Sequence, residues 1–297
     1  MDSVLTSVAL PLALALVMFG LGLALTLGDF GRVSRHPRAV VIALTLQLAV
    51  LPVICFGLVV AFDLDPLLAV GVMLLAASPG GTSANLFSHL FRGDVALNIT
   101  LTAVNSLIAV VTLPIITNLA LGYFEPDIGD GSVGLQFGKT AQVFAIVLVP
   151  VALGMLVRRR SPAFAARSDK PVRILSAVVL ALVILGTILA ERDNIVDYFT
   201  EVGLPALLFC LASLGIGFLV PRALGVVREQ ATASAFEIGV HNGTLAIAVA
   251  ISVLSSVELA VPAAVYSVLM FPTAAVFGWV LVRAQGRTAD EPAASRS

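Results

Sequence analysis

Two segments of the sequence place glycine and hydrogen-bonding side chains inside long hydrophobic runs. They are SPGGTSAN at 78–85 and EIGVHNGT at 237–244. Proline followed by two glycines interrupts a helix, and an interrupted helix leaves unpaired N–H groups on one half and unpaired carbonyl groups on the other. Such N–H groups suit an anion such as a carboxylate, whereas free carbonyls with side-chain oxygens suit a hard cation. The two segments therefore predict a site for an anion and a hard cation.

Glu237 is the only acidic residue that lies well inside a hydrophobic segment. A charged side chain at the centre of a bilayer costs about 2.5–3.5 kcal/mol even on the mildest scale. Its position indicates a functional group that faces the protein interior. A structural acid, paired with a neighbouring side chain, is the alternative interpretation.

Further polar side chains lie in two other hydrophobic segments. Asn98, Thr102 and Asn105 are three or four residues apart and so share one helix face, with Ser106 beside them. Gln47 is isolated in its segment. Side chains of these types can supply oxygen ligands, or they can join helices by hydrogen bonds.

The composition indicates which elements must position these residues. Of the 297 residues, 59% are hydrophobic and 12% are charged; the mean hydropathy is +1.05 and the formal net charge is −1. A soluble domain has about 25% charged residues, so the composition argues against a soluble enzyme, a disordered protein or a nucleic-acid binder. Cys55 and Cys210 fit neither a disulfide framework nor a metal site. The chain is predicted to be an all-α polytopic membrane protein.

Nine segments are long and apolar enough to be transmembrane helices, which need about 20 residues each. They are 4–28, 39–62, 66–91, 95–123, 140–157, 171–190, 202–220, 230–257 and 260–283. The first is predicted to stay in the mature protein, because no basic residue precedes it as in a signal peptide.

The distribution of basic residues predicts the orientation. With nine helices and an external N-terminus, 15 of the 17 basic residues fall on the inner side, and only Lys139 and Arg192 fall outside. The run Arg158–Arg160 marks the inner face and suits contact with anionic membrane lipid. We expect a bacterial-type inner (plasma) membrane protein whose C-terminus is cytoplasmic, with a disordered tail at 286–297.

The two interrupted segments are predicted to occupy corresponding places in two inverted repeats. Repeats of inverted topology need an odd number of helices, so two sets of five are expected. The segment 230–257 is fourth among the last five, and 66–91 becomes fourth in its set if one N-terminal helix is missing. The nine helices would then form a four-plus-five arrangement in which two broken helices cross near the membrane midplane.

Four motifs, in this order, resemble those of the bile acid/sodium symporter family and its bacterial members. They are MFGLGLALTLGDF (18–30) with HPRAV (36–40), Gln47 five residues before Pro52, PGGTSAN (79–85) with RGDVALNITLT (92–102), and EIGVHNGTLA (237–246). The resemblance implies a panel of helices from 1–30 and 140–192, and a core of helices from 37–123 and 198–285. It also implies a transporter rather than an enzyme, one that moves a small organic anion (carboxylate or bile-acid-like) into the cell with sodium.

The resemblance further implies site residues, position by position. The first sodium site would use Asn85, Asn98, Thr102, Glu237 and position 84, which is Ala84. The second would use Gln47, Glu237, the carbonyls of Ile238 and Val240, and His241. Substrate contacts would come from Thr82, Asn242 and Gly81, near the starts of the half-helices.

Three positions depart from the family pattern. Ala84 replaces a serine and removes a hydroxyl, and Asn98 replaces a serine but keeps an oxygen. His241 replaces a glutamine, and imidazole is a poor sodium ligand that titrates near neutral pH. We therefore expect His241 either to weaken the second sodium site or to replace sodium by a proton.

Other functions remain open at this point. A proton-coupled transporter, or one of altered stoichiometry, would use the same fold, and so would a membrane receptor or channel. A membrane enzyme has no support, because the sequence has no HExxH or GxSxG motif and no second acid inside the hydrophobic segments to pair with Glu237.

Overall fold

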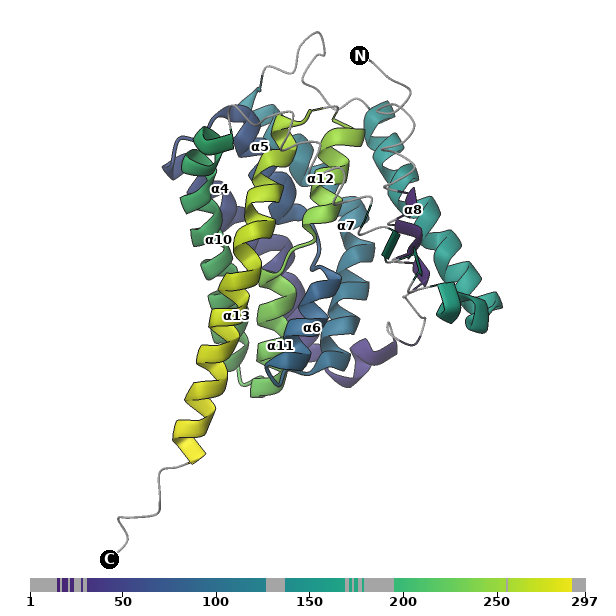
Figure 1. Ribbon diagram of the computed structural model, residues 1–297, viewed down its shortest axis with the longest axis vertical. Coiled ribbons are helices and arrows are strands. Elements are labelled where there is room, and N and C mark those ends of the chain that lie inside the picture. The colour runs from purple at the N-terminus through teal and green to yellow at the C-terminus, as the bar shows by residue number, and fades with distance from the viewer. Residues whose placement is uncertain are drawn as a thin grey trace, which may run out of the picture.

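A computed structural model describes residues 31–126, 137–168 and 195–289 apart from residue 255, together with a few residues between 15 and 28 and between 171 and 178. Within this part the regular elements are all helices, and the one β-bridge is isolated. Figure 1 shows the helices packed side by side, with α8 (Phe137–Arg160) at the edge of the group and the end of α13 (Val261–Ala289) projecting from it.

The described helices follow the predicted hydrophobic segments. In chain order after the short η2 (Arg32–Arg35), they are α3 (Pro37–Thr45), η3 (Leu46–Val50), α4 (Leu51–Ala61), α5 (Pro66–Ala77), α6 (Thr82–Leu90), α7 (Val95–Phe124), α8, α10 (Ile195–Ala223), α11 (Arg228–Gly239), α12 (Gly243–Ser252), η4 (Glu258–Ala260) and α13. Four stretches are long and apolar enough to cross a membrane as single helices: Pro37–Ala61, Val95–Phe124, Asp197–Ala223 and Glu258–Ala284.

Parts of the prediction fall outside this description. The predicted helices 4–28 and 171–190 lie almost wholly outside the described residues, so the count of nine and the inverted repeats stay predictions. At the other end of the chain, α13 continues to Ala289 and therefore extends into the segment predicted as a tail. Residues 290–297 lie outside the described part.

Both interrupted segments are broken helices, as predicted. The first consists of α5 and α6, which are separated by residues 78–81, and the second of α11 and α12, which are separated by 240–242. Pro79 biases Ser78 away from the helical conformation, and Ser78 is indeed extended, with φ −72° and ψ 145°. The sequence around each break thus ends one half-helix and starts the next inside the hydrophobic region.

Gln47 lies in a π-helical turn of the first long apolar helix. The N–H of Leu51 donates to the carbonyl of Leu46, five residues back. Pro52 has no N–H and its ring crowds the preceding turn, so the regular α-helical pattern cannot continue through it. The widened turn carries Gln47 into the interior, where its side chain is 3% exposed.

Basic residues gather where three loops meet at one end of the bundle. The N–H of Asp94 donates to the carbonyl of Glu229 (2.9 Å), and the side chains of His36 and Gln230 approach to 2.9 Å. Asp94 also caps α7 by accepting a hydrogen bond from the N–H of Leu97 at 2.9 Å. Five arginines lie in these loops or in the adjacent helix ends: Arg35, Arg38, Arg92, Arg222 and Arg228.

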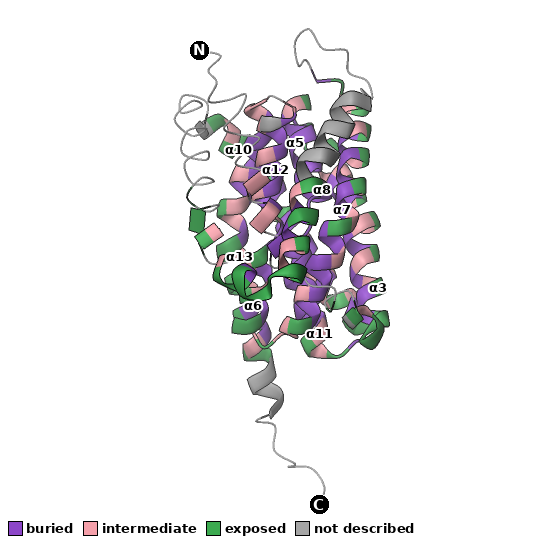
Figure 2. Ribbon diagram, turned by 90° about the vertical axis from the view of Figure 1, so that its right-hand side faces the viewer, coloured by how far each residue is buried: buried purple, intermediate pink, exposed green. Residues whose placement is uncertain are grey.

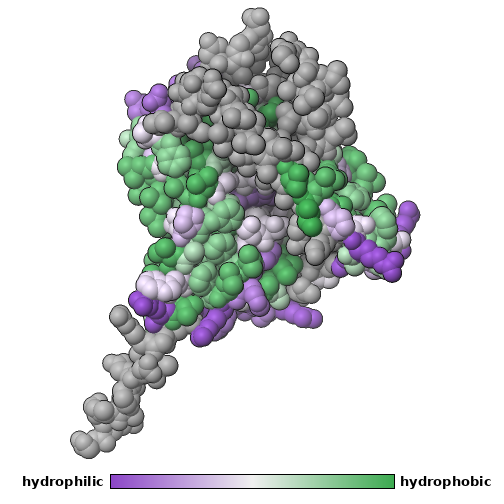
Figure 3. Space-filling model, in the orientation of Figure 1, coloured by the Kyte–Doolittle hydropathy of each residue, from purple (hydrophilic) through white to green (hydrophobic). Residues whose placement is uncertain are grey.

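The opposite end of the bundle is acidic. There the N–H of Asp65, which precedes α5, donates to the Glu201 carboxylate near the start of α10 (2.9 Å). Between the two ends the surface is apolar: Figure 3 shows hydrophobic residues across the middle of one face and hydrophilic ones along its lower edge. A basic end, an apolar belt and an acidic end fit a helix bundle that spans a membrane.

Small residues bring helix backbones into direct contact. A Cβ added at Gly217 of α10 would meet the Cα of Ala235 in α11, and one added at Gly154 of α8 would meet the backbone of Phe19 and Gly22. Contacts of this kind hold helices together in lipid, where apolar burial alone does not. The buried residues in Figure 2 accordingly concentrate inside the bundle, around the two broken helices.

Candidate functional site

The two breaks pair with each other through the backbone. The N–H of Gly81 donates to the carbonyl of Val240 at 2.8 Å, and the N–H of Asn242 donates to the carbonyl of Pro79 at 2.8 Å. These bonds form an antiparallel bridge between Gly80 and His241. The predicted crossing of the two broken helices is therefore present, and it brings residues that are far apart in the sequence to one point.

Glu237 lies beside this crossing, on the last turn of α11, and is 2% exposed. Its Oε2 accepts a hydrogen bond from the hydroxyl of Thr102, whereas Oε1 has no hydrogen-bond partner. The backbone of Gly80 lies so close that an added Cβ would overlap the carboxylate. A buried carboxylate with an unsatisfied oxygen is costly unless a counter-charge is supplied.

Predicted residues of the first sodium site gather around Glu237. The amide nitrogen of Asn98 donates to Ser88 Oγ (2.7 Å) and to the carbonyl of Ala233 (2.9 Å). Both amide hydrogens are thus used, and Oδ1 is left 3.5 Å from the hydroxyl of Thr102. The structure therefore brings Asn98, Thr102 and Glu237 together from α7 and α11.

The remaining residues predicted for this site lie on α6. Asn85 is half-buried, and its Oδ1 is a buried oxygen without a hydrogen-bond partner. Ala84 is fully buried and contributes only a methyl group, while its N–H donates to the carbonyl of Gly81 at 2.9 Å. Positions 84 and 85 thus offer one free side-chain oxygen where the family pattern has two residues with oxygens.

Two predicted residues of the second sodium site share one carbonyl. Gln47 donates through Nε2 to the carbonyl of Ser78 (3.0 Å), and His241 Nδ1 lies 3.3 Å from the same oxygen. A carbonyl only accepts, so this contact requires a proton on Nδ1, and when the imidazole is neutral Nε2 presents a lone pair. Gln47 Oε1 and His241 Nε2 are both buried without a partner.

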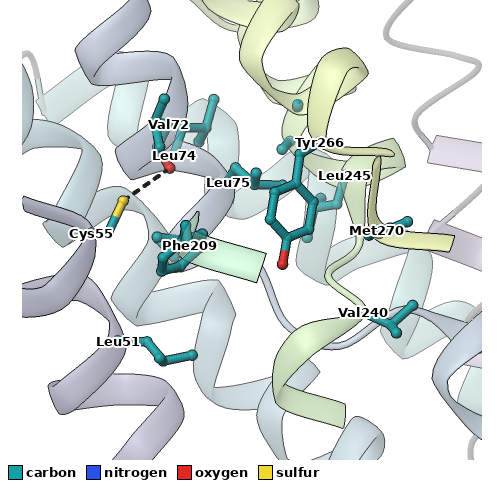
Figure 4. Close-up of a cluster of buried hydrophobic side chains, with 14 of the residues drawn as sticks. Leu51, Cys55, Val72, Leu74, Leu75, Phe209, Val240, Leu245, Tyr266 and Met270 are labelled. Atoms are coloured by element: carbon teal, nitrogen blue, oxygen red, sulfur yellow. Dashed lines mark hydrogen bonds between the residues drawn. The ribbon is translucent and has the colours of Figure 1, made fainter. Parts of the chain in front are cut away.

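The imidazole of His241 is held between aromatic rings. Phe209 stacks on it with a centroid distance of 5.4 Å and an interplanar angle of 20°, and Tyr266 meets it edge-on at 5.4 Å. The Tyr266 hydroxyl donates to the carbonyl of Gly239 at 2.9 Å. Figure 4 shows Phe209 and Tyr266 approaching the second break from α10 and α13. Neither ring carries a sequence signal that links it to the site.

The backbone positions predicted for the second site lie at the end of α11 and in the break. Ile238 and Val240 are both fully buried. The carbonyl of Val240 already accepts from the N–H of Gly81, but a carbonyl oxygen has a second lone pair that can bind a cation. The bridge between the breaks therefore fixes where this carbonyl lies.

The predicted substrate contacts lie where the second half-helices begin. Thr82 is exposed at the first turn of α6, directly after Gly81, which is buried. Asn242 is half-buried and caps α12, because its Oδ1 accepts from the N–H of Leu245 at 3.1 Å. Its Oδ1 is thus used in the cap. Both helix starts follow directly after the paired breaks, and a helix N-terminus is an arrangement that binds anions.

Asn105 is a polar residue of this region that the family resemblance includes in neither sodium site. It is 1% exposed, lies beside the Glu237 carboxylate, and has no hydrogen-bond partner at either Nδ2 or Oδ1. In the sequence, the spacing of three residues between Asn105 and Thr102 indicates that the two side chains share one helix face.

Unsatisfied acceptors outnumber donors around the crossing. The side-chain acceptors without a partner are Gln47 Oε1, Asn85 Oδ1, Asn105 Oδ1, Glu237 Oε1 and His241 Nε2. Among these same residues, Asn105 Nδ2 is the buried donor without a partner. Buried polar groups are normally satisfied, and a cation satisfies several acceptors at once. The arrangement is therefore suited to bind a hard cation.

The chain is similar in sequence to known membrane transporters. The model of the Sodium Bile acid symporter family matches residues 11–198. A Bacillus subtilis protein, the uncharacterized sodium-dependent transporter YocS, is 29% identical over 255 residues, which cover 86% of this chain and 77% of that protein.

Two eukaryotic relatives are similar at the same level. The human ileal sodium/bile acid cotransporter is 28% identical over 279 residues, covering 93% of this chain and 79% of its own. The probable sodium/metabolite cotransporter BASS1, chloroplastic, of Arabidopsis thaliana is 27% identical over 259 residues, covering 86% and 62%. The family match spans more than half of the sequence, and the chain therefore belongs to the sodium bile acid symporter family, whose members are sodium-coupled membrane transporters and not enzymes.

Proposed function

We propose that the protein is a secondary active transporter that moves a small organic anion into the cell together with sodium, by alternating access. The observation that carries this proposal is the excess of unsatisfied buried acceptors around Glu237, at the crossing of two broken helices. A cation would neutralise the carboxylate, and its charge would favour an anion at the nearby helix starts. Because the cation site and the anion site lie close together, binding of sodium favours binding of the anion, and the transport of the two solutes is coupled.

Uptake into proteoliposomes tests this function. The purified protein is supplied with a bile salt or with small mono- and dicarboxylates, under an inward sodium gradient and under a matched potassium gradient. We expect saturable uptake of at least one carboxylate that requires sodium. Ion current without saturable uptake would instead indicate a channel, and binding without uptake would indicate a receptor.

Glu237 is proposed to serve both sodium ions, one with each carboxylate oxygen. The first ion would be held by Asn85, Asn98, Thr102 and Glu237 near position 84. The second would be held by Gln47, Glu237, the carbonyls of Ile238 and Val240, and position 241. The contact between Thr102 and the Glu237 carboxylate, together with its unpartnered Oε1, supports this shared role.

The proposed substrate residues Thr82, Asn242 and Gly81 give the first prediction. Replacing Asn242 with aspartate keeps the cap on α12 but places a negative charge where an anion would bind. We expect the KM for the transported carboxylate to rise about tenfold, since a repulsion of about 1.4 kcal/mol has that effect. The sodium concentration for half-maximal uptake should stay nearly constant.

The same measurement on Thr82→Ala provides the matched comparison. Thr82 is exposed at the start of α6 and does not touch the predicted sodium ligands through any hydrogen bond found in the described residues. A variant of either residue that loses sodium affinity while keeping its KM for the carboxylate would show that the division of roles is wrong.

A second candidate function couples transport to a proton at His241. It is favoured by Nε2 of His241, which is buried without a partner and can accept a proton where a sodium ion would otherwise bind. The titratable side chain nearest to the ring, Tyr266, already donates its hydroxyl hydrogen elsewhere. The proton would then take the place of the second sodium ion.

The variant His241→Gln separates the two possibilities. If His241 carries a proton, the variant should acquire a steeper sodium dependence, because glutamine supplies a neutral oxygen ligand. Its uptake rate should also lose whatever pH dependence protonation of the imidazole gives the unmodified protein. An unchanged sodium dependence with an unchanged pH profile would contradict the proton-coupled mechanism.

We propose that transport involves a movement of the panel helices relative to the core helices. The close contact of α8 with Phe19 and Gly22 supports one body made of the segments 1–30 and 140–192, next to a core that contains both broken helices. The basic end of the bundle is proposed to face the cytoplasm, with the N-terminus outside, in a bacterial-type inner membrane. Anionic lipid would contact the arginine-rich end of α8.

A further inference from the structure

Asn105 is the buried polar residue near the crossing whose side chain is unsatisfied at both ends. It lies on α7 and is 1% exposed, and neither Nδ2 nor Oδ1 has a hydrogen-bond partner. Because both atoms are unpaired, this holds whichever way the amide is oriented. An amide buried in this way without a partner costs roughly 1–3 kcal/mol, so its presence needs an explanation.

Helix geometry places Asn105 at the depth of the crossing. α7 is 30 residues long and begins at Val95, so Asn105 lies about 15 Å along it at 1.5 Å per residue. That depth is about half the thickness of the hydrocarbon core. Asn105 follows Thr102 by one turn on the same face, and it lies beside the Glu237 carboxylate.

Two threonines of α7 are satisfied within their own helix, whereas the hydroxyls of Ser106 and Thr117, like the amide of Asn105, are buried without a hydrogen-bond partner. Thr100 donates to the carbonyl of Ala96 at 2.9 Å, and Thr112 donates to the carbonyl of Ile108 at 3.3 Å. Thr102 has the carbonyl of Asn98 at 3.0 Å in addition to the Glu237 carboxylate. Threonine achieves this through its short hydroxyl, whereas the amide of Asn105 makes no hydrogen bond to the backbone of its own helix. Its partner must therefore come from outside α7.

Glu237 Oε1 is the neighbouring atom that needs the same partner. Oε1 and Asn105 Oδ1 are both acceptors. The amide nitrogen is the group of Asn105 that can donate to the neighbouring carboxylate, which leaves Oδ1 free for a cation. A cation between them would satisfy both. An amide oxygen adds a ligand without adding charge, which suits a monovalent ion beside a single carboxylate.

We propose that Asn105 is a further ligand of the coupling sodium ion, with Oδ1 binding the ion that Glu237 Oε1 also binds. This assignment rests on the proposed sodium-coupled function and adds a residue to its site. Asn105 supplies an oxygen from α7 in a chain where Ala84 offers only a methyl group on α6. The ligands of the ion then come mainly from α7 and α11. These two helices are already joined by the hydrogen bond from the amide of Asn98 to the carbonyl of Ala233.

Sodium-dependent stabilisation of the purified protein tests this assignment. The melting temperature is followed as NaCl replaces choline chloride at constant ionic strength, without substrate. For Asn105→Ala we expect the NaCl concentration for half-maximal stabilisation to rise about tenfold, the effect of losing one ligand to a charged group. Asn105→Ser retains an oxygen at the same position and should show a smaller rise.

Thr100→Val is the matched control, because it replaces a buried hydroxyl on the same helix with an isosteric apolar group. Its sodium titration should match that of the unmodified protein. An unchanged sodium titration in Asn105→Ala would overturn the assignment, even if its melting temperature in choline chloride fell, since that result indicates a packing role. If the unmodified protein shows no sodium response, the proposed function fails and the assignment fails with it.

Discussion

Replacing Glu237 with glutamine is expected to abolish sodium-driven uptake. Glutamine has nearly the same shape and can still accept the hydrogen bond from Thr102. It lacks the negative charge that neutralises the charge of the bound cation. Loss of one partner of a buried charge pair costs about 3–5 kcal/mol, so sodium affinity should fall by at least about a hundredfold.

The same substitution should increase stability when no sodium is present. In the unmodified protein the carboxylate is buried with Oε1 unsatisfied, and a neutral amide in its place removes the cost of a buried charge. We therefore expect Glu237→Gln to melt at a higher temperature than the unmodified protein in choline chloride. In NaCl, only the unmodified protein should be stabilised further.

Glu229→Gln is the matched control for Glu237→Gln. Glu229 lies on the same helix, α11, but its side chain is exposed at the basic end of the bundle. Its substitution should leave both uptake and the sodium response intact. Normal sodium-dependent uptake by Glu237→Gln would refute the role of Glu237 as the shared ligand.

Replacing Gly80 with alanine is expected to have the second large effect. A Cβ at this position would overlap the carboxylate of Glu237 and the backbone carbonyl of the same residue. Relief of that overlap requires a shift of the backbone bridge between Gly80 and His241. Overpacking of this kind costs about 1–3 kcal/mol of unfolding free energy, and the shift also displaces the carboxylate from its partners.

Gly57→Ala is the control for this substitution. Gly57 lies in α4, is exposed, and has open space where its Cβ would be added. Alanine there should leave the melting temperature unchanged or raise it, because alanine favours a helix more than glycine does. We expect Gly80→Ala to melt at a lower temperature and to lose its sodium response. Similar behaviour of the two variants would show that the crossing tolerates a side chain.

Local features of the sequence were sufficient to predict the breaks and the central acid. A hydrophobic run long enough to cross a membrane, a Pro-Gly-Gly interruption and an isolated glutamate depend only on neighbours in the chain. The cap by Asp94 is also local, since it joins residues three apart. These features follow from chain length, backbone conformation and the cost of burying charge.

The partners of each polar atom required the tertiary structure. The hydroxyl of Thr102 meets a carboxylate 135 residues away, and His241 meets the carbonyl of Ser78 163 residues away. Periodicity places Asn98, Thr102 and Asn105 on one face, but it does not show that Asn98 is satisfied while Asn105 is not.

A membrane helix bundle with two broken helices and one buried acid could thus be predicted from the sequence, because these features depend on local hydrophobicity and backbone chemistry. The pairing of the breaks through Gly80 and His241, the contact of His241 with the carbonyl of Ser78, and the oxygens left for a cation became visible only in the folded chain. The physical reason is that satisfaction of a buried polar group depends on distances between segments remote in the chain, and no local pattern encodes those distances.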